Sequence, residues 1–137
     1  MRTKLLLDTC AVLYVTEQKL GAMALKAMDD AFNANTPVSV SAITAWEIGL
    51  LSERGRLPTT APPLRYFEEF VALPGIQLET LTPSVLVESS FLPTPIHRDP
   101  ADRMIIATAR ALDLTIVTSD RLILEYASRG HVRALAC

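Results

Sequence analysis

The sequence has few cysteines and no long apolar run. Its 137 residues contain only Cys10 and Cys137, too few for the disulfide framework of a small secreted domain, and no CxxC or Cys/His cluster indicates zinc. The apolar run at residues 5–7 ends at Asp8, and the longest uncharged stretch, residues 31–46, contains Asn, Pro and hydroxyl residues. We therefore expect neither a signal peptide nor a membrane span, and we predict a cytoplasmic protein.

A surplus of positive charge is also lacking. The chain has 13 Lys and Arg residues against 15 Asp and Glu residues, a formal net charge of −2. Taken alone, this balance argues against a nucleic-acid partner, because binding to a polyphosphate normally rests on excess positive charge. The length and the 50% hydrophobic content predict one domain, residues 1–137, with a sizeable core.

Short apolar runs alternate with helical patterns along the chain. We predict strands at residues 4–7, 38–40, 76–81 and 114–118, and a fifth edge strand at 132–135. Helices are predicted after Asp8, over residues 22–32, 41–55, 66–71 and 83–91, from Asp99, and from Asp120 to about residue 128. The alternation predicts an α/β fold with three α/β/α layers and a mostly parallel central sheet.

Two aspartates come directly after predicted strands. Asp8 follows the first strand, and Asp120 follows the strand at 114–118. In parallel sheets, ligands bind outside the carboxyl ends of the strands, so both residues are candidates for a binding site. Each has an equally plain interpretation as the polar exit of a strand or the cap of the next helix, and both alternatives stay open for each residue alone.

Two more carboxylates project from apolar helix faces. Glu47 lies four residues after Ile43 on a face where Trp46 is expected to pack in the core. Asp102 precedes two inward isoleucines by three and four residues. A buried carboxylate is costly without a positive partner. The alternatives are a Glu47 that reaches water and an Asp102 favoured by the helix dipole. Asp99, before a proline, is predicted to cap its helix.

Convergence of these acids on one crevice predicts a metal site. Mutual repulsion among Asp8, Glu47, Asp102 and Asp120 would be severe without a cation, and Mg²⁺ prefers hard oxygen ligands. The sequence contains no HExxH, Walker or GxGxxG motif. His97 and His131 lack the spacing of metal ligands, and we predict that His97 is a hydrogen-bonding group of its loop.

Four segments in this order resemble the PIN-domain ribonucleases, in particular the VapC-like toxins of bacterial toxin–antitoxin pairs. They are Asp8-Thr9 after three leucines, Trp46-Glu47-Ile48, DPADRMIIATA from Asp99, and Thr118-Ser119-Asp120. The resemblance implies a PIN-like fold and assigns metal binding and catalysis to four acids, Asp8, Glu47, Asp102 and Asp120. It also implies that the side chains beside them support the site or position the substrate: Thr9, Asp99, Arg103, Thr118 and Ser119.

The same resemblance implies an activity and its partners. The activity is endonucleolytic hydrolysis of RNA by a metal-activated water, with Mg²⁺ as the cofactor and Mn²⁺ as the alternative ion. The implied partners are a cognate antitoxin that blocks the active site and a second copy of the chain in a homodimer. Operator DNA would be bound only indirectly, through the antitoxin.

Two other classes of protein are weighed against this hypothesis. A phosphorelay receiver needs a paired acid after the first strand and a late lysine, whereas this chain has Asp8-Thr9 and no lysine after Lys26. A non-catalytic protein-interaction module with the same fold would use its acids as helix caps. If four acids hold a cation, the rest of the chain carries a formal charge of +2, so the net acidity does not exclude an RNA substrate.

Overall fold

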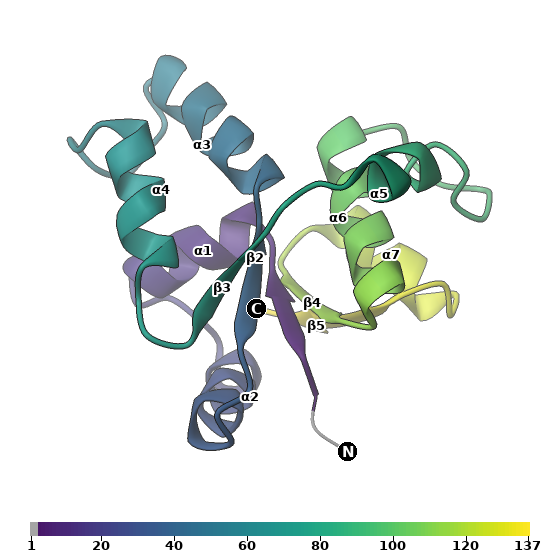
Figure 1. Ribbon diagram of the computed structural model, residues 1–137, viewed down its shortest axis with the longest axis horizontal. Coiled ribbons are helices and arrows are strands. Elements are labelled where there is room, and N and C mark those ends of the chain that lie inside the picture. The colour runs from purple at the N-terminus through teal and green to yellow at the C-terminus, as the bar shows by residue number, and fades with distance from the viewer. Residues whose placement is uncertain (1–2) are drawn as a thin grey trace.

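The computed structural model describes residues 3–137, so residues 1 and 2 of the predicted domain lie outside the described residues. Strands and helices alternate along the chain (Figure 1). The strands are β1 (Leu5–Leu7), β2 (Val38–Ser41), β3 (Ile76–Glu79), β4 (Thr115–Thr118) and β5 (Arg133–Ala136). The helices are α1 (Thr9–Thr16), α2 (Ala22–Asn33), α3 (Ile43–Glu53), α4 (Pro63–Val71), α5 (Pro83–Glu88), α6 (Pro100–Leu112) and α7 (Arg121–Ser128).

The strands form one sheet in the order β3-β2-β1-β4-β5, and every pair of neighbours is parallel. The predicted mostly parallel sheet is thus confirmed, with β5 as the predicted edge strand. The chain builds outward from β1 to β2 and β3, and then returns to the other side of β1 for β4 and β5. The carboxyl ends of all five strands consequently lie at one edge of the sheet.

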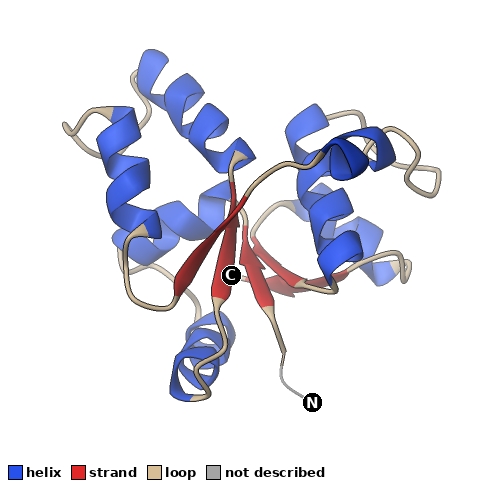
Figure 2. Ribbon diagram, viewed as in Figure 1, coloured by secondary structure: helices blue, strands red, loops and turns tan. Residues whose placement is uncertain are grey.

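Helices cover both faces of the sheet (Figure 2). Because successive strand residues point to opposite faces, Leu5 and Leu7 pack in one core cluster and Leu6 packs in the other. The first cluster includes side chains of α1, α2 and α4, and the second includes side chains of α5, α6 and α7. The predicted α/β/α architecture is therefore confirmed.

Aspartates cap three of the helices. The Asp8 side chain accepts from Ala11 N, the Asp99 side chain accepts from Asp102 N, and the Asp120 side chain accepts from two backbone N–H groups of α7. Such caps satisfy N–H groups that have no partner inside the helix. All three aspartates are therefore helix caps. At Asp8 and Asp120, the capping hydrogen bonds also hold the side chain of a candidate site residue in place.

The prediction that Trp46 packs in the core is wrong, since its side chain is 53% exposed. The buried residues of α3 are Ile43, Thr44 and Ile48. Trp46 lies two residues from both Thr44 and Ile48, a rotation of roughly 200°, and therefore points to the opposite side of the helix. Two predicted elements are also too long, because β3 ends at Glu79 and α5 ends at Glu88. Among the described helices, none is long and apolar enough to cross a membrane.

Candidate functional site

The candidate site lies at the carboxyl ends of β1 and β4, where the strand order passes from one side of β1 to the other. β1 leads through Asp8 into α1, which packs on one face, and the neighbouring β4 leads through Asp120 into α7, which packs on the other. The two adjacent strands thus lead to helices on opposite faces, and the region outside the carboxyl ends of strands at such a switch point is the usual ligand site of these folds. The fold therefore places Asp8 and Asp120 at a preferred binding position.

Asp8 is held from three directions. Its side chain is buried, with 6% of the residue exposed. Oδ1 accepts hydrogen bonds from Cys10 Sγ at 2.9 Å and from Ala11 N at 3.0 Å, and Oδ2 accepts one from the hydroxyl of Thr118. That hydroxyl also accepts from Asp120 N at 2.9 Å, so Thr118 links the two strand-end aspartates. Asp8 is consequently fixed in one orientation.

Glu47 approaches the site from α3 and contacts the first turn of α1. The hydroxyl of Thr9 donates to Glu47 Oε1 at 2.6 Å, whereas Oε2 receives no hydrogen bond from any described residue. Thr9 is itself buried and lies 3.2 Å from the hydroxyl of Thr44. The structure thus brings Thr9 and Glu47 into direct contact beside Asp8.

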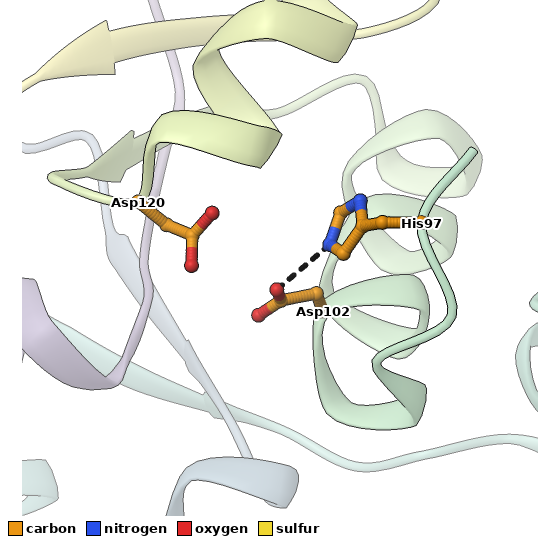
Figure 3. Close-up of side chains that lie close together, drawn as sticks. All are labelled: His97, Asp102 and Asp120. Atoms are coloured by element: carbon orange, nitrogen blue, oxygen red, sulfur yellow. Dashed lines mark hydrogen bonds and ion pairs between the residues drawn. The ribbon is translucent and has the colours of Figure 1, made fainter. Parts of the chain in front are cut away.

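Asp102 and Asp120 face each other together with His97 (Figure 3). Nε2 of His97 lies 2.8 Å from Asp102 Oδ2, and one ligand atom from each of the three residues lies within 4.8 Å of the others. Asp120 uses Oδ1 for the α7 cap and leaves Oδ2 without a hydrogen bond from the described residues. Asp102 likewise leaves Oδ1 without one. Asp8 and Glu47 lie outside this tight group.

The remaining predicted site residues support the acids in different ways. Arg103 does not contact a carboxylate, because its Nε donates to the backbone carbonyl of His97 at 2.8 Å. Asp99 is exposed and binds the backbone N–H of Asp102 at 2.9 Å. Ser119 lies near the site through its backbone N–H, which is 3.3 Å from Cys10 Sγ. The recorded contacts of these three residues are thus with neighbouring backbone or with Cys10.

The four acids form one electrostatic unit. Burial, aided by the charges of Asp102, Asp99 and Asp8, raises the pKa of Glu47 to about 7. Burial and the nearby Asp120 raise the pKa of Asp102 to about 6, and the same two causes raise the pKa of Asp8. No described lysine or arginine forms an ion pair with any of the four acids, and the basic side chain that contacts one of them is the imidazole of His97. Oxygen donors with uncompensated negative charge fit a hard divalent cation.

The sequence did not indicate the partner of His97. The predicted hydrogen-bonding role is confirmed, and the partner of the imidazole is the site residue Asp102. The separation of five residues between His97 and Asp102 does not predict a contact, because the chain between them is a loop followed by the start of a helix. The Arg103 contact to the His97 carbonyl holds this loop against α6, beside Asp102.

These features define an α/β protein with an acidic site at the switch point of a parallel sheet. The model of the family described as "PIN domain" matches residues 5–128, and the chain belongs to the PIN domain family. A relative named Ribonuclease VapC22, from Mycobacterium tuberculosis (strain ATCC 25618 / H37Rv), is 32% identical over 104 residues, which cover 76% of this chain and 75% of the relative. The family resemblance inferred from the motifs is confirmed.

Solved structures share the fold at low sequence identity. VapBC2 from Rickettsia felis, bound to a DNA fragment from its promoter, matches with a TM-score of 0.69 and 11% identity over 98% of this chain and 98% of that chain. FitAcB from Neisseria gonorrhoeae matches with a TM-score of 0.56 and 20% identity over 96% of both chains. At such identities, the comparison supports the fold alone.

Proposed function

We propose that the protein is a metal-dependent endoribonuclease that acts as the toxin of a toxin–antitoxin pair. The observation that carries this proposal is the placement of Asp8 and Asp120 at neighbouring strand ends, with Asp102 beside Asp120 and Glu47 bound to Thr9, and with no described lysine or arginine paired to these acids. Membership of the PIN domain family and the similarity to a protein named as a ribonuclease support the reaction type.

The four carboxylates would hold Mg²⁺, or Mn²⁺ in its place. Asp102 Oδ1, Asp120 Oδ2 and Glu47 Oε2 receive no hydrogen bonds from described residues and are available as ligands. Asp8 is more fully engaged, but Oδ2 accepts only the Thr118 hydroxyl and keeps a second lone pair. When bound, the metal supplies a water of lowered pKa and neutralises charge on the phosphate.

The chain's own contribution is to fix these oxygens before RNA arrives. Thr118, Cys10 and the Ala11 N–H hold Asp8, and the Thr9 hydroxyl holds Glu47. Each hydrogen bond stabilises the ionised carboxylate against the burial that disfavours it. Prior orientation reduces the reorganisation needed when the scissile phosphate enters, which is the main advantage of a preorganised site.

Arginines near the acids would position the flanking phosphates. Arg98 and Arg121 are exposed, adjoin Asp99 and Asp120 in sequence, and form no recorded ion pair with a described acid. Their guanidinium groups suit bidentate contacts with phosphate. We assign Arg103 to the support of the His97 loop, and its remaining N–H groups are available to the RNA.

The proposed setting is a toxin–antitoxin pair in the cytoplasm. Structures with the same fold include the two-component assemblies VapBC2 and FitAB, which supports a protein partner for this chain. We propose that a cognate antitoxin covers the four acids and that two copies of this chain form a homodimer. Operator DNA would be contacted only through the antitoxin. Size-exclusion chromatography with light scattering, with and without the coexpressed antitoxin, tests the two protein contacts.

RNA cleavage tests the activity directly. Purified protein is incubated with structured and single-stranded RNA in Mg²⁺, in Mn²⁺ or in chelator, alongside Asp8→Asn, which retains a cap but loses the charge. We expect cleavage only by the wild type with a metal. Cleavage that persists in chelator or in Asp8→Asn contradicts the proposal, and the variant's melting curve controls for its folding.

A further inference from the structure

The imidazole of His97 lies beside the acids of the candidate site, and the proposed reaction has not used it. Its imidazole is largely buried, with 14% of the side chain exposed, and Nε2 is directed at Asp102 (Figure 3). The other histidine, His131, stacks against Tyr126 with ring centroids 4.9 Å apart and has no contact with the acids. The two histidines therefore serve different parts of the molecule.

His97 is held in place by the helix that carries Asp102. Arg103 Nε donates to the His97 carbonyl at 2.8 Å, and the Arg103 backbone N–H donates to the Asp99 carbonyl at 3.1 Å. The first contact binds the loop before α6 to that helix, and the second is the first backbone hydrogen bond of α6, which fixes the position of Arg103. The imidazole position is thus built into the fold rather than left to an unconstrained loop.

One distance at His97 fits two ligands of one ion. Neighbouring ligand atoms about 2.1 Å from an octahedral ion lie about 3 Å apart. The separation of 2.8 Å between His97 Nε2 and Asp102 Oδ2 is close to this value and is also the length of a direct hydrogen bond, and a donor atom of Asp120 lies within 4.8 Å of both. The hydrogen of a neutral imidazole can reside on Nδ1, which has no hydrogen-bond partner among the described residues.

We propose that His97 is a nitrogen ligand of the metal site, together with Asp102 and Asp120, and that the site therefore prefers Mn²⁺ to Mg²⁺. This inference rests on the proposed function and specifies which metal ion its site prefers. Mg²⁺ is bound almost entirely through oxygen and water, whereas imidazole nitrogen suits transition metals. A mixed nitrogen and oxygen set shifts the selectivity toward Mn²⁺, with the Asp8 and Glu47 carboxylates available to complete the site.

The competing interpretation is that His97 only orients Asp102 through a hydrogen bond. His97→Gln separates the two, because a glutamine amide places an N–H donor near the position of Nε2 but removes the imidazole. If His97 is a ligand, His97→Gln lowers the ratio of Mn²⁺ to Mg²⁺ affinity, because the lost nitrogen donor favours a transition metal over Mg²⁺. If His97 is only a positioning residue, the ratio stays unchanged, and that result overturns the proposal.

Electron spin-echo spectroscopy of Mn²⁺ bound to the full chain gives a direct readout. Protein labelled with ¹⁵N-histidine is titrated with Mn²⁺ alone, and the binding stoichiometry is measured by calorimetry. We expect nitrogen coupling in the wild type and in His131→Asn, the matched control, and its loss in His97→Gln. Saturable Mn²⁺ binding without nitrogen coupling overturns the His97 assignment only, whereas failure of the wild type to bind Mn²⁺ or Mg²⁺ overturns the metal site and the proposed function together.

Discussion

The hydroxyl of Thr9 donates a 2.6 Å hydrogen bond to Glu47 Oε1 and so joins the first turn of α1 to the middle of α3. The two residues are 38 positions apart in sequence. This contact opposes the effect of burial on Glu47, because it stabilises the ionised form of a carboxylate whose pKa is about 7. The charge state of Glu47 near neutral pH thus depends on a residue of another helix.

Replacement of Thr9 by Val tests this contact. Thr9→Val keeps the branched shape but removes the donor, so we expect the pKa of Glu47 to rise further above its present value of about 7. The loss of stability is expected to be about 1.5–3 kcal/mol where Glu47 is ionised and smaller where it is protonated. Urea unfolding at about pH 5 and about pH 8 measures the difference.

Thr16→Val is the matched control for that measurement. The Thr16 hydroxyl is exposed and contacts the Tyr66 hydroxyl at 2.6 Å, away from the acids. We expect its effect on stability to be the same at both pH values. Equal losses at both pH values in Thr9→Val would contradict the coupling between Thr9 and Glu47.

Stability of the metal-free protein is expected to fall as the pH rises through the acidic range. Glu47 has an ordinary pKa of 4.5 and a folded value of about 7, so the folded state binds more protons than the unfolded chain between these values. Asp102 acts in the same direction between 3.8 and about 6. The free energy of unfolding must therefore decrease with pH across these windows.

Glu47→Gln isolates the contribution of one acid to that pH dependence. The variant carries no titrating group at position 47, so its unfolding free energy in chelator should decrease less between about pH 4.5 and about pH 7 than that of the wild type. Chemical denaturation across this range measures both slopes. An identical slope in the two proteins would show that Glu47 does not titrate as its surroundings imply.

A bound divalent ion should stabilise the fold. Mn²⁺ or Mg²⁺ at about 100 times its dissociation constant is expected to add about 2.7 kcal/mol to the wild type by binding linkage. Asp102→Asn should lose most of this gain, whereas Asp29→Asn, an exposed acid of α2, should keep it. Melting temperatures with metal and with chelator measure the effect. Insensitivity of the wild type to both ions would favour the non-catalytic interaction module.

Arg103 is expected to act by geometry rather than by charge. Its Nε donates to the His97 carbonyl, and a lysine ammonium cannot reproduce the planar guanidinium at that position. Arg103→Lys should therefore reduce RNA cleavage as strongly as Arg103→Gln, with a loss of stability of about 0.5–1.5 kcal/mol in each. Cleavage rates and urea midpoints check this. Full activity in Arg103→Lys would instead favour a role in attracting phosphate.

The helices and the aspartates that cap three of them could be predicted from local sequence. Asp99 before Pro100 marks the start of α6, and Asp8 and Asp120 mark the starts of α1 and α7, because capping depends on residues within one helical turn. The phase of α3 was predicted less well. Trp46 is apolar and follows Ile43 at helical spacing, yet the buried face is set by which side of α3 meets the sheet.

The α/β alternation, the parallel sheet and the family could be predicted from the sequence, since they depend on periodicity and on motifs within short segments. The contacts that hold the acids could not: Thr118 with Asp8, Thr9 with Glu47, and His97 with Asp102. The order of the strands brings distant segments together at Asp8 and Glu47. The fold of the loop before α6 brings His97 to Asp102. The physical reason is that such contacts are fixed by packing of whole elements, for which local spacing contains no signal.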